Sequence, residues 1–241
     1  MKKILCLLLA LVMVLGLGAC AFDIGNDSSF GVSKTPVAKP TELTEDTLMG
    51  TWAANLTARD VIAMGITGID SSEDKQLAEL MIEKAPANLD MEILFVCDGE
   101  DCYNLVNVEE FKELFIEIVE TTYTADVYRK ACGIFDMSEE EFLAETGCAS
   151  FEEVAEKTKS RMMMRIDEEI EATLAFDTAL SESRNGFAIG MVDYWQIVGN
   201  ELYLSDDGEE MCYKYDGTSL NVAITDRVNL TYKHISNKTD Y

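Results

Sequence analysis

The part of the chain that follows Phe187 constrains the fold most strongly. Segments of alternating apolar and polar residues recur there, and turns containing Gly or Asp separate them every eight or nine residues. Alternation with a period of two is typical of a half-buried strand, and Asp-Gly is among the strongest hairpin signals. The spacing therefore predicts an antiparallel meander with turns at Gly199-Asn200, Asp207-Gly208, Asp216-Gly217 and Asp226-Arg227.

Three more strands are expected nearer the N-terminus. The first follows Thr51, and the other two, 91–97 and 102–108, flank an Asp98-Gly99 turn. With the C-terminal segments they make about eight or nine strands. Eight strands closed into a barrel leave space for one small ligand or for packed side chains, and closure removes exposed strand edges. A small open sheet beside a separate helical domain is the alternative.

Helical periodicity dominates the stretch between the third strand and the meander. Apolar residues from Phe111 to Tyr123 recur at i, i+3, i+4 and i+7, which places them on one stripe of a helix. Ser138 and Ser150 each precede acidic residues, a combination that favours a helix N-terminus, and one long helix is expected after Ser150. The fold class is therefore α+β, an antiparallel β-barrel or strongly curved meander with a helical insertion at 109–183, between strands three and four.

The N-terminus carries a secretory signal. Two lysines precede an apolar run, and small residues follow before Cys20. This order defines a signal peptide, here residues 1–19. An uncleaved membrane helix over 4–22 is the alternative, but the run is barely long enough to span a bilayer. Residues 20–46 are rich in Ser, Thr, Asp, Lys and Pro, so they are expected to form a flexible tether.

The end of this signal, Leu17-Gly18-Ala19-Cys20, resembles the lipobox of bacterial lipoproteins. The resemblance implies that diacylglycerol is attached to the thiol of Cys20 and that Cys20 becomes the mature N-terminus. Each buried methylene group contributes about 0.8 kcal/mol, so two acyl chains anchor a protein stably. The expected location is the extracytoplasmic face of the cell membrane, with the lipid on Cys20 as the membrane contact.

A second resemblance concerns the folded part, residues 47–241. Gly50-Thr51-Trp52 before the first strand, the segment 195–204 and a closing strand at 230–235 resemble lipocalin-like (calycin-type) lipoproteins. The resemblance implies a β-barrel in which a basic residue of the last strand, here Lys233 or Arg227, packs over the Trp of the first strand. The helical stretch departs from a plain lipocalin, whose strands follow one another closely.

Charge narrows the range of partners. Lys and Arg number 19 against 45 Asp and Glu, which gives a net charge of −26. Nucleic acid is excluded as a partner because phosphate binding needs clustered basic residues. The same charge repels anionic lipid, so the Cys20 lipid alone should hold the chain at the membrane.

The cysteines of the folded part are odd in number, which does not suggest a disulfide-stapled scaffold. Two of them flank the Asp98-Gly99 turn and could face each other across a hairpin, so a disulfide there stays open. Buried free thiols are the default for the others. The five residues are Cys97, Cys102, Cys132, Cys148 and Cys212.

Signals for catalysis are sparse. His234 is the only histidine, and no Cys-x-x-Cys pair, phosphate-binding glycine loop or Gly-x-Ser-x-Gly is present. Two acidic turns, 98–101 and 206–210, lack the ligand spacing of a calcium loop. We therefore expect no catalytic residues, no metal and no cofactor.

Two functions remain. In the first, the barrel of this non-catalytic lipoprotein holds a small apolar or amphipathic ligand against inward-facing residues, for which Trp195, Tyr213 and Tyr215 are the candidates. In the second, the barrel is filled by side chains and the surface meets another protein of the cell envelope. The same three residues would then be core.

Overall fold

The computed structural model describes residues 42–65, 71–174, 186–192, 194–206 and 209–239. The expected signal peptide, Cys20 and most of the expected tether lie outside these residues, as does the Asp207-Gly208 turn. The chain divides into two compact units. A sheet unit includes Glu92–Val106 and the residues from Ile189 onward, and a helical unit comprises Leu56–Met91 and Asn107–Ala188.

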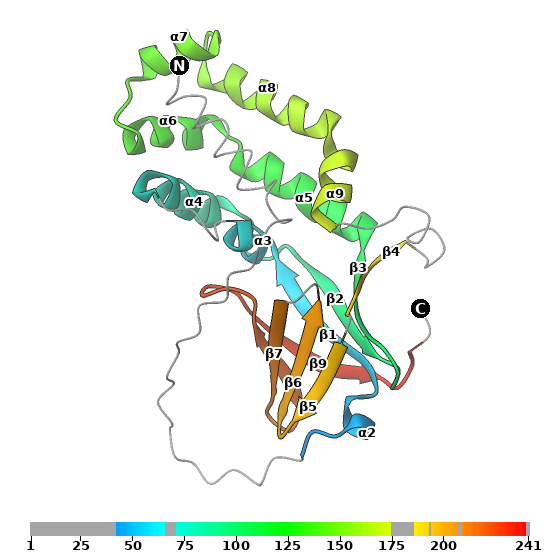
Figure 1. Cartoon of the computed structure of the whole chain (residues 1–241). Coiled ribbons are helices and arrows are strands. Elements are labelled where there is room, and N and C mark those ends of the chain that lie inside the picture. Colours follow the sequence, from blue (N-terminus) through cyan, green and yellow to red (C-terminus); the bar gives the residue numbers. More distant parts are fainter. Residues whose placement is uncertain (1–41, 66–70, 175–185, 193, 207–208, 240–241) are drawn as a thin grey trace. The chain divides into compact units, whose positions relative to one another are not determined.

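Nine strands in the described part of the chain form one antiparallel sheet that curls into a half-barrel (Figure 1). They are β1 (Gly50–Thr57), β2 (Asp90–Cys97), β3 (Cys102–Asn107), β4 (Phe187–Met191), β5 (Tyr194–Val198), β6 (Glu201–Asp206), β7 (Glu209–Tyr215), β8 (Ser219–Ala223) and β9 (Asn229–Ser236). Their order across the sheet is β4-β3-β2-β1-β9-β8-β7-β6-β5. The meander predicted for the C-terminal part is confirmed as β5 to β9.

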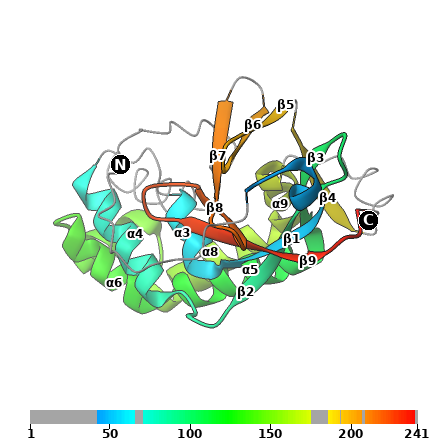
Figure 2. The same cartoon turned by 90° about the horizontal axis from the view of Figure 1, so that it is seen from below.

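Strands that follow each other in the sequence are also neighbours in the sheet, with one exception. Consecutive strands are neighbours except β4 and β5, which lie at the two edges, and the first and last strands, β1 and β9, pair with each other (Figure 2). Pairing of the first strand with the last is what an up-and-down barrel requires. The sheet is therefore compatible with the predicted barrel-like fold, opened between β4 and β5.

Tight turns set the register of the meander. Gly199 (φ +63°) and Gly217 (φ +101°) occupy the left-handed region after β5 and β7, where most side chains are strained. In the second of these turns the carboxylate of Asp216 accepts hydrogen bonds from the N–H groups of Thr218 and Ser219, at 2.9 and 2.8 Å. Turn chemistry thus places these hairpins where the sequence predicts them.

The pairing of β1 with β9 centres on Trp52. This side chain is buried, and its indole N–H donates to the carbonyl of Leu48, at the end of helix α2 (Glu45–Leu48), at 2.8 Å. The ring of His234 packs edge-on against Trp52, with 5.0 Å between centroids, in the place that the resemblance gives to Lys233 or Arg227. His234 is the residue paired with Trp52, and successive residues of a strand face opposite sides, so Lys233 faces away.

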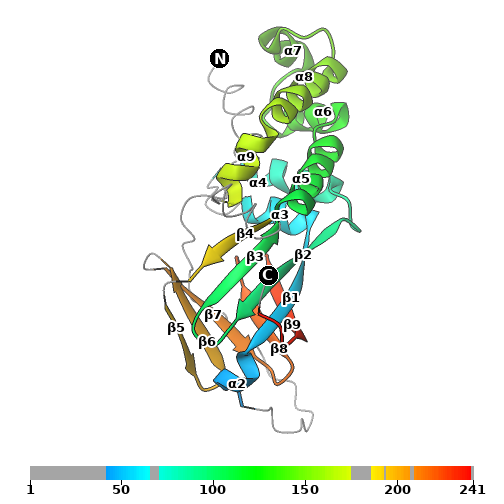
Figure 3. The same cartoon turned by 90° about the vertical axis from the view of Figure 1, so that its right-hand side faces the viewer.

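Seven helices make up the described part of the helical unit (Figure 3). Two of them, α3 (Ala58–Gly65) and α4 (Ser72–Lys84), lie in sequence between β1 and β2. The other five lie between β3 and β4, in the stretch where the helical insertion is predicted. They are α5 (Val108–Thr122), α6 (Ala125–Ile134), α7 (Glu139–Thr146), α8 (Phe151–Met164) and α9 (Ile166–Leu174).

The helix starts predicted at Ser138 and Ser150 are confirmed. Their side chains accept hydrogen bonds from the backbone N–H groups of Glu141 and Glu153, at 3.1 and 3.2 Å. The prediction of one long helix after Ser150 is wrong, because the chain breaks at Arg165 between α8 and α9. None of the helices in the described residues is long and apolar enough to cross a membrane.

Candidate functional site

The register of the meander defines one apolar face of the sheet. Residues directly opposite each other on neighbouring strands share a face. The pairs run from Trp195 and Leu204 on β5 and β6 to Leu220 and Tyr232 on β8 and β9. We call this face the inner face. Its buried members on β6 to β9 are Leu202, Leu204, Tyr213, Leu220, Val222, Leu230 and Tyr232.

All three residues predicted to face inward lie on the inner face, but their surroundings differ. Tyr213 is 1% exposed, stacks on Phe95 of β2 at 5.6 Å and lies 5.9 Å from the ring of Tyr232. Burial raises the pKa of the Tyr213 hydroxyl, and the amide of Asn104 beside it opposes this rise. Tyr213 is therefore part of an aromatic core that joins β2, β7 and β9.

Tyr215, two residues along β7, is partly exposed. Its ring meets Trp52 edge-on at 6.2 Å between centroids, and its hydroxyl donates to the carbonyl of Gly217 at 2.9 Å. One side of the ring is therefore held by core packing, while the rest of the side chain stays accessible to solvent.

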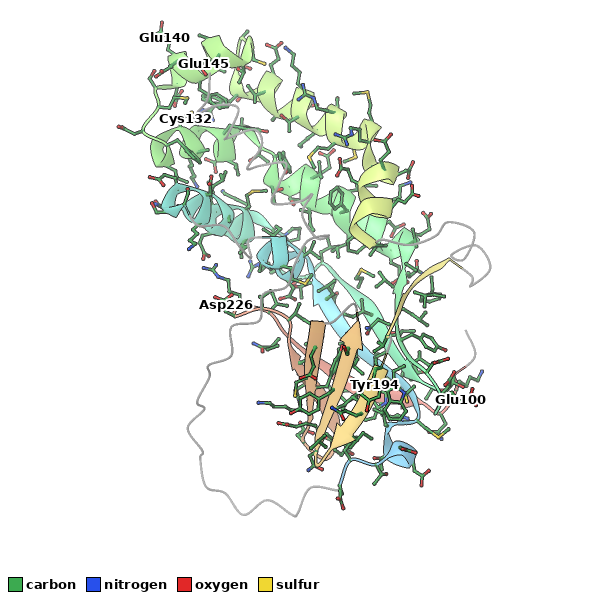
Figure 4. All side chains as sticks on the ribbon, viewed as in Figure 1. Glu100, Cys132, Glu140, Glu145, Tyr194 and Asp226 are labelled. Carbon is green, nitrogen blue, oxygen red and sulfur yellow. The ribbon has the colours of Figure 1, made fainter. Side chains whose placement is uncertain are left out.

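Trp195 lies on β5, at the edge of the sheet, and is also partly exposed. Its indole N–H donates to the carbonyl of Glu100 at 3.1 Å, in the turn between β2 and β3. Glu100 and Tyr194, the residue before Trp195, are labelled in Figure 4. This hydrogen bond links β5 to the β2–β3 hairpin, two parts of the sheet that are not neighbours in the strand order.

Asn104 is a polar residue that sequence reasoning missed. It pairs with Phe95 across β2 and β3 and so lies on the inner face. Its Oδ1 atom is buried and makes no hydrogen bond within the described part of the chain. An amide in the middle of an otherwise apolar strand segment, Tyr103 to Val106, is the signal that could have drawn attention to it.

The opposite face of β5 is the most exposed apolar part of the sheet. Tyr194 and Val198 are 58% and 56% exposed, and the strand, Tyr-Trp-Gln-Ile-Val, contains no charge and no proline. Among the described residues β5 has a strand partner, β6, on one side only. Natural sheets usually protect such an edge with charges, proline or a covering segment.

Comparison with family models, with curated proteins and with solved structures finds no match to this chain.

Two further observations concern His234 and metal binding. Nε2 of His234 lies 3.2 Å from the carbonyl oxygen of Met49, and its ring packs on Trp52. Nowhere in the described ranges do three or more His, Cys, Asp or Glu side chains gather closely enough to hold a metal ion. What the inner face offers is an aromatic surface with one unpaired amide oxygen, which suits binding.

Proposed function

We propose that this chain is a lipid-anchored, extracytoplasmic, non-catalytic lipoprotein whose lipocalin-like sheet binds a small apolar or amphipathic ligand on its inner face. The observation that carries the proposal is the buried, unpaired Oδ1 of Asn104 on a face that also presents partly exposed Trp195 and Tyr215. Ligand sites of this kind combine apolar walls with a few placed polar groups.

The unpaired oxygen also indicates the chemistry of the ligand. A buried acceptor without a donor costs about 1–3 kcal/mol, so a bound O–H or N–H group that reaches Asn104 would recover this free energy. The rings of Trp195 and Tyr215 are suited to an apolar body. The ligand class is therefore an apolar molecule with a hydrogen-bond donor, such as an alcohol, an amide or a protonated acid.

Native mass spectrometry of the intact protein, extracted from membranes in mild detergent, tests this function. We expect a mass above that of the denatured chain, and we expect Trp195→Ala to lose the difference. Tyr194→Ala is the matched control, because Tyr194 is the neighbouring aromatic residue on the opposite face of β5. Equal masses for the native and denatured wild type would count against a bound ligand.

Asn104→Leu separates binding from folding. The substitution removes the unpaired oxygen and keeps the approximate volume, so the free protein should gain roughly 1 kcal/mol in free energy of unfolding while it loses the ligand. If Asn104→Leu still carries the ligand mass, Asn104 is not part of the ligand site.

The second candidate function is binding of an envelope protein, and the exposed edge strand β5 favours it. An extended segment of a partner can add to such an edge through main-chain hydrogen bonds. Val198→Lys places a charge on this edge and should abolish cross-linking to a partner in cells, while the ligand mass of the purified protein stays unchanged. An unaltered cross-linking pattern would argue against strand addition.

The lipid anchor has its own test. Cys20→Ala should abolish incorporation of labelled palmitate and release the protein from the membrane fraction, because two acyl chains supply the anchoring free energy. Cys212→Ala is the control, since Cys212 lies on β7 in the folded sheet. Palmitate incorporation by Cys20→Ala would mean that the lipid is attached elsewhere.

A further inference from the structure

Two cysteines face each other at the closed end of the β2–β3 hairpin. Cys97 is the last residue of β2, Cys102 is the first residue of β3, and the two are directly opposite in the register. Both side chains are buried, 1% and 0% exposed. Of the other three cysteines, Cys132 and Cys148 belong to the helical unit and Cys212 lies on β7.

The turn between them fixes their separation. The N–H of Asp98 donates to the carbonyl of Asp101 at 3.1 Å, and the Asp98 carboxylate accepts from the N–H groups of Glu100 and Asp101 at 2.9 and 2.8 Å. Because hydrogen-bonded and non-hydrogen-bonded pairs alternate in an antiparallel ladder, Cys97 and Cys102 form a non-hydrogen-bonded pair. The Cα atoms of such pairs are about 4.5 Å apart, which a disulfide can bridge.

The thiols already interact. Their interaction lowers the pKa of the Cys97 thiol and raises that of the Cys102 thiol. Thiol–disulfide exchange begins with attack by a thiolate, and the second cysteine then resolves the mixed disulfide.

We propose that Cys97 and Cys102 are a site of disulfide formation that cross-links β2 to β3 beside the turn contacted by Trp195. The inference rests on the extracytoplasmic location proposed above, where disulfides persist. The oxidant is the disulfide of a thiol–disulfide exchange protein. During folding, before the hairpin is buried, the thiolate of one cysteine, here Cys97, attacks one sulfur of this disulfide and displaces the other as a thiolate. Cys102, losing its proton to water, then attacks the Cys97 sulfur, and the oxidant leaves as a dithiol.

Differential alkylation of the full chain, extracted from membranes without reductant, tests the site. The protein is unfolded in N-ethylmaleimide, reduced, labelled with iodoacetamide and mapped by peptide mass spectrometry. We expect iodoacetamide on Cys97 and Cys102, and N-ethylmaleimide on Cys132, Cys148 and Cys212. In Cys102→Ala, Cys97 should carry N-ethylmaleimide instead of iodoacetamide. In Cys212→Ala, the labels on Cys97 and Cys102 should stay unchanged. Maleimide on both Cys97 and Cys102 in palmitate-labelled wild-type protein overturns the inference.

A second measurement does not depend on where the protein resides in the cell. The purified, reduced chain is refolded with oxidised glutathione, and the linked peptides are identified. A single cross-link between Cys97 and Cys102 supports the site, and glutathione that leaves these two unlinked overturns it. Palmitate on Cys20 tests the proposed location separately. A wrong location and a wrong disulfide assignment therefore give different results.

Discussion

At the scale of single residues, Gly50 is a position where a side chain does not fit. Its φ of +121° lies in the region that only glycine adopts readily, and a Cβ atom there would lie 2.4 Å from the carbonyl oxygen of Ser236 and 2.6 Å from Nε2 of His234. Gly50 therefore lets β1 approach β9 closely enough for Trp52 and His234 to pack. This is a physical reason for a glycine two residues before the tryptophan.

Gly50→Ala should lower the free energy of unfolding of the sheet unit by about 2–3 kcal/mol, because both the backbone and the added Cβ are strained. Urea unfolding followed by tryptophan fluorescence measures this unit, since Trp52 and Trp195 both lie in it. Gly199→Ala is the control: its φ is also positive, but a Cβ would meet nothing within 4 Å. Equal losses for the two variants would exclude the predicted clash.

Asp216 makes the stability of the sheet unit depend on pH. Partial burial raises the pKa of its carboxyl, but hydrogen bonds from Thr218, Ser219 and Asn221 outweigh this and lower it overall. The ionised form therefore stabilises the folded state. This contribution is complete above the unfolded pKa of about 3.9 and is lost as pH falls through the lower folded value.

Asp216→Asn should therefore be less stable than the wild type at about pH 7, and the difference should shrink towards about pH 2.5. Urea midpoints of both proteins at several pH values measure it. If the difference between the two urea midpoints stayed constant across this range, the lower stability of Asp216→Asn would not come from the lost charge.

At the scale of elements, the sequence was informative wherever two independent signals agreed. Strands β5 to β9 combine a period of two with turn residues at regular spacing, and helices α7 and α8 combine a serine cap with acidic first turns. The break at Arg165 carries neither glycine nor proline, and buried Met162, Ile166 and Ile170 continue the same four-residue spacing through it. Periodicity cannot distinguish one helix from two in that case.

The candidate site was less predictable than the strands. Strand alternation correctly puts Trp195, Tyr213 and Tyr215 on one face, but it cannot say that Tyr213 packs on Phe95 while Trp195 reaches Glu100. Those contacts depend on how far the sheet curls. The residue that packs on Trp52 was not predicted either. The lipocalin resemblance implies Lys233 or Arg227, whereas the register of β1 and β9, which no local pattern marks, pairs Trp52 with His234.

Among the helices, α7 is held by one aromatic residue. Phe142 is fully buried, 5.6 Å from the ring of Phe151 on α8 and 6.0 Å from that of Tyr128 on α6. Phe142→Ala should cost about 3–5 kcal/mol, seen as an earlier loss of helical circular dichroism in urea. Leu143→Ala, at the next and partly exposed position, should cost clearly less. Comparable losses would show that the aromatic stack contributes little.

At the scale of the whole molecule, some neighbouring strands are joined by short turns and others by helices. Most neighbouring strands are joined by short turns, whereas helices α3 to α9 lie between β1 and β2 and between β3 and β4. Sequence signals therefore define the parts well, because each part is made of local contacts. Strands β4 and β5 are the edges of the sheet because they do not pair with each other. Local sequence signals do not show this.

The pairing of β1 with β9 has a consequence for the order in which the chain can fold. Met49 and His234, which contact each other, are 185 residues apart, so β1 is synthesised first and must wait for the last strand before its edge is covered. A circular permutant that begins at β5, ends at β4 and joins β9 to β1 through a flexible linker would make this contact local. It should refold about tenfold faster in stopped-flow fluorescence than the natural order, because contact order governs folding rate. In its natural order, the first strand of the sheet is the one whose edge stays uncovered until the last strand has been made.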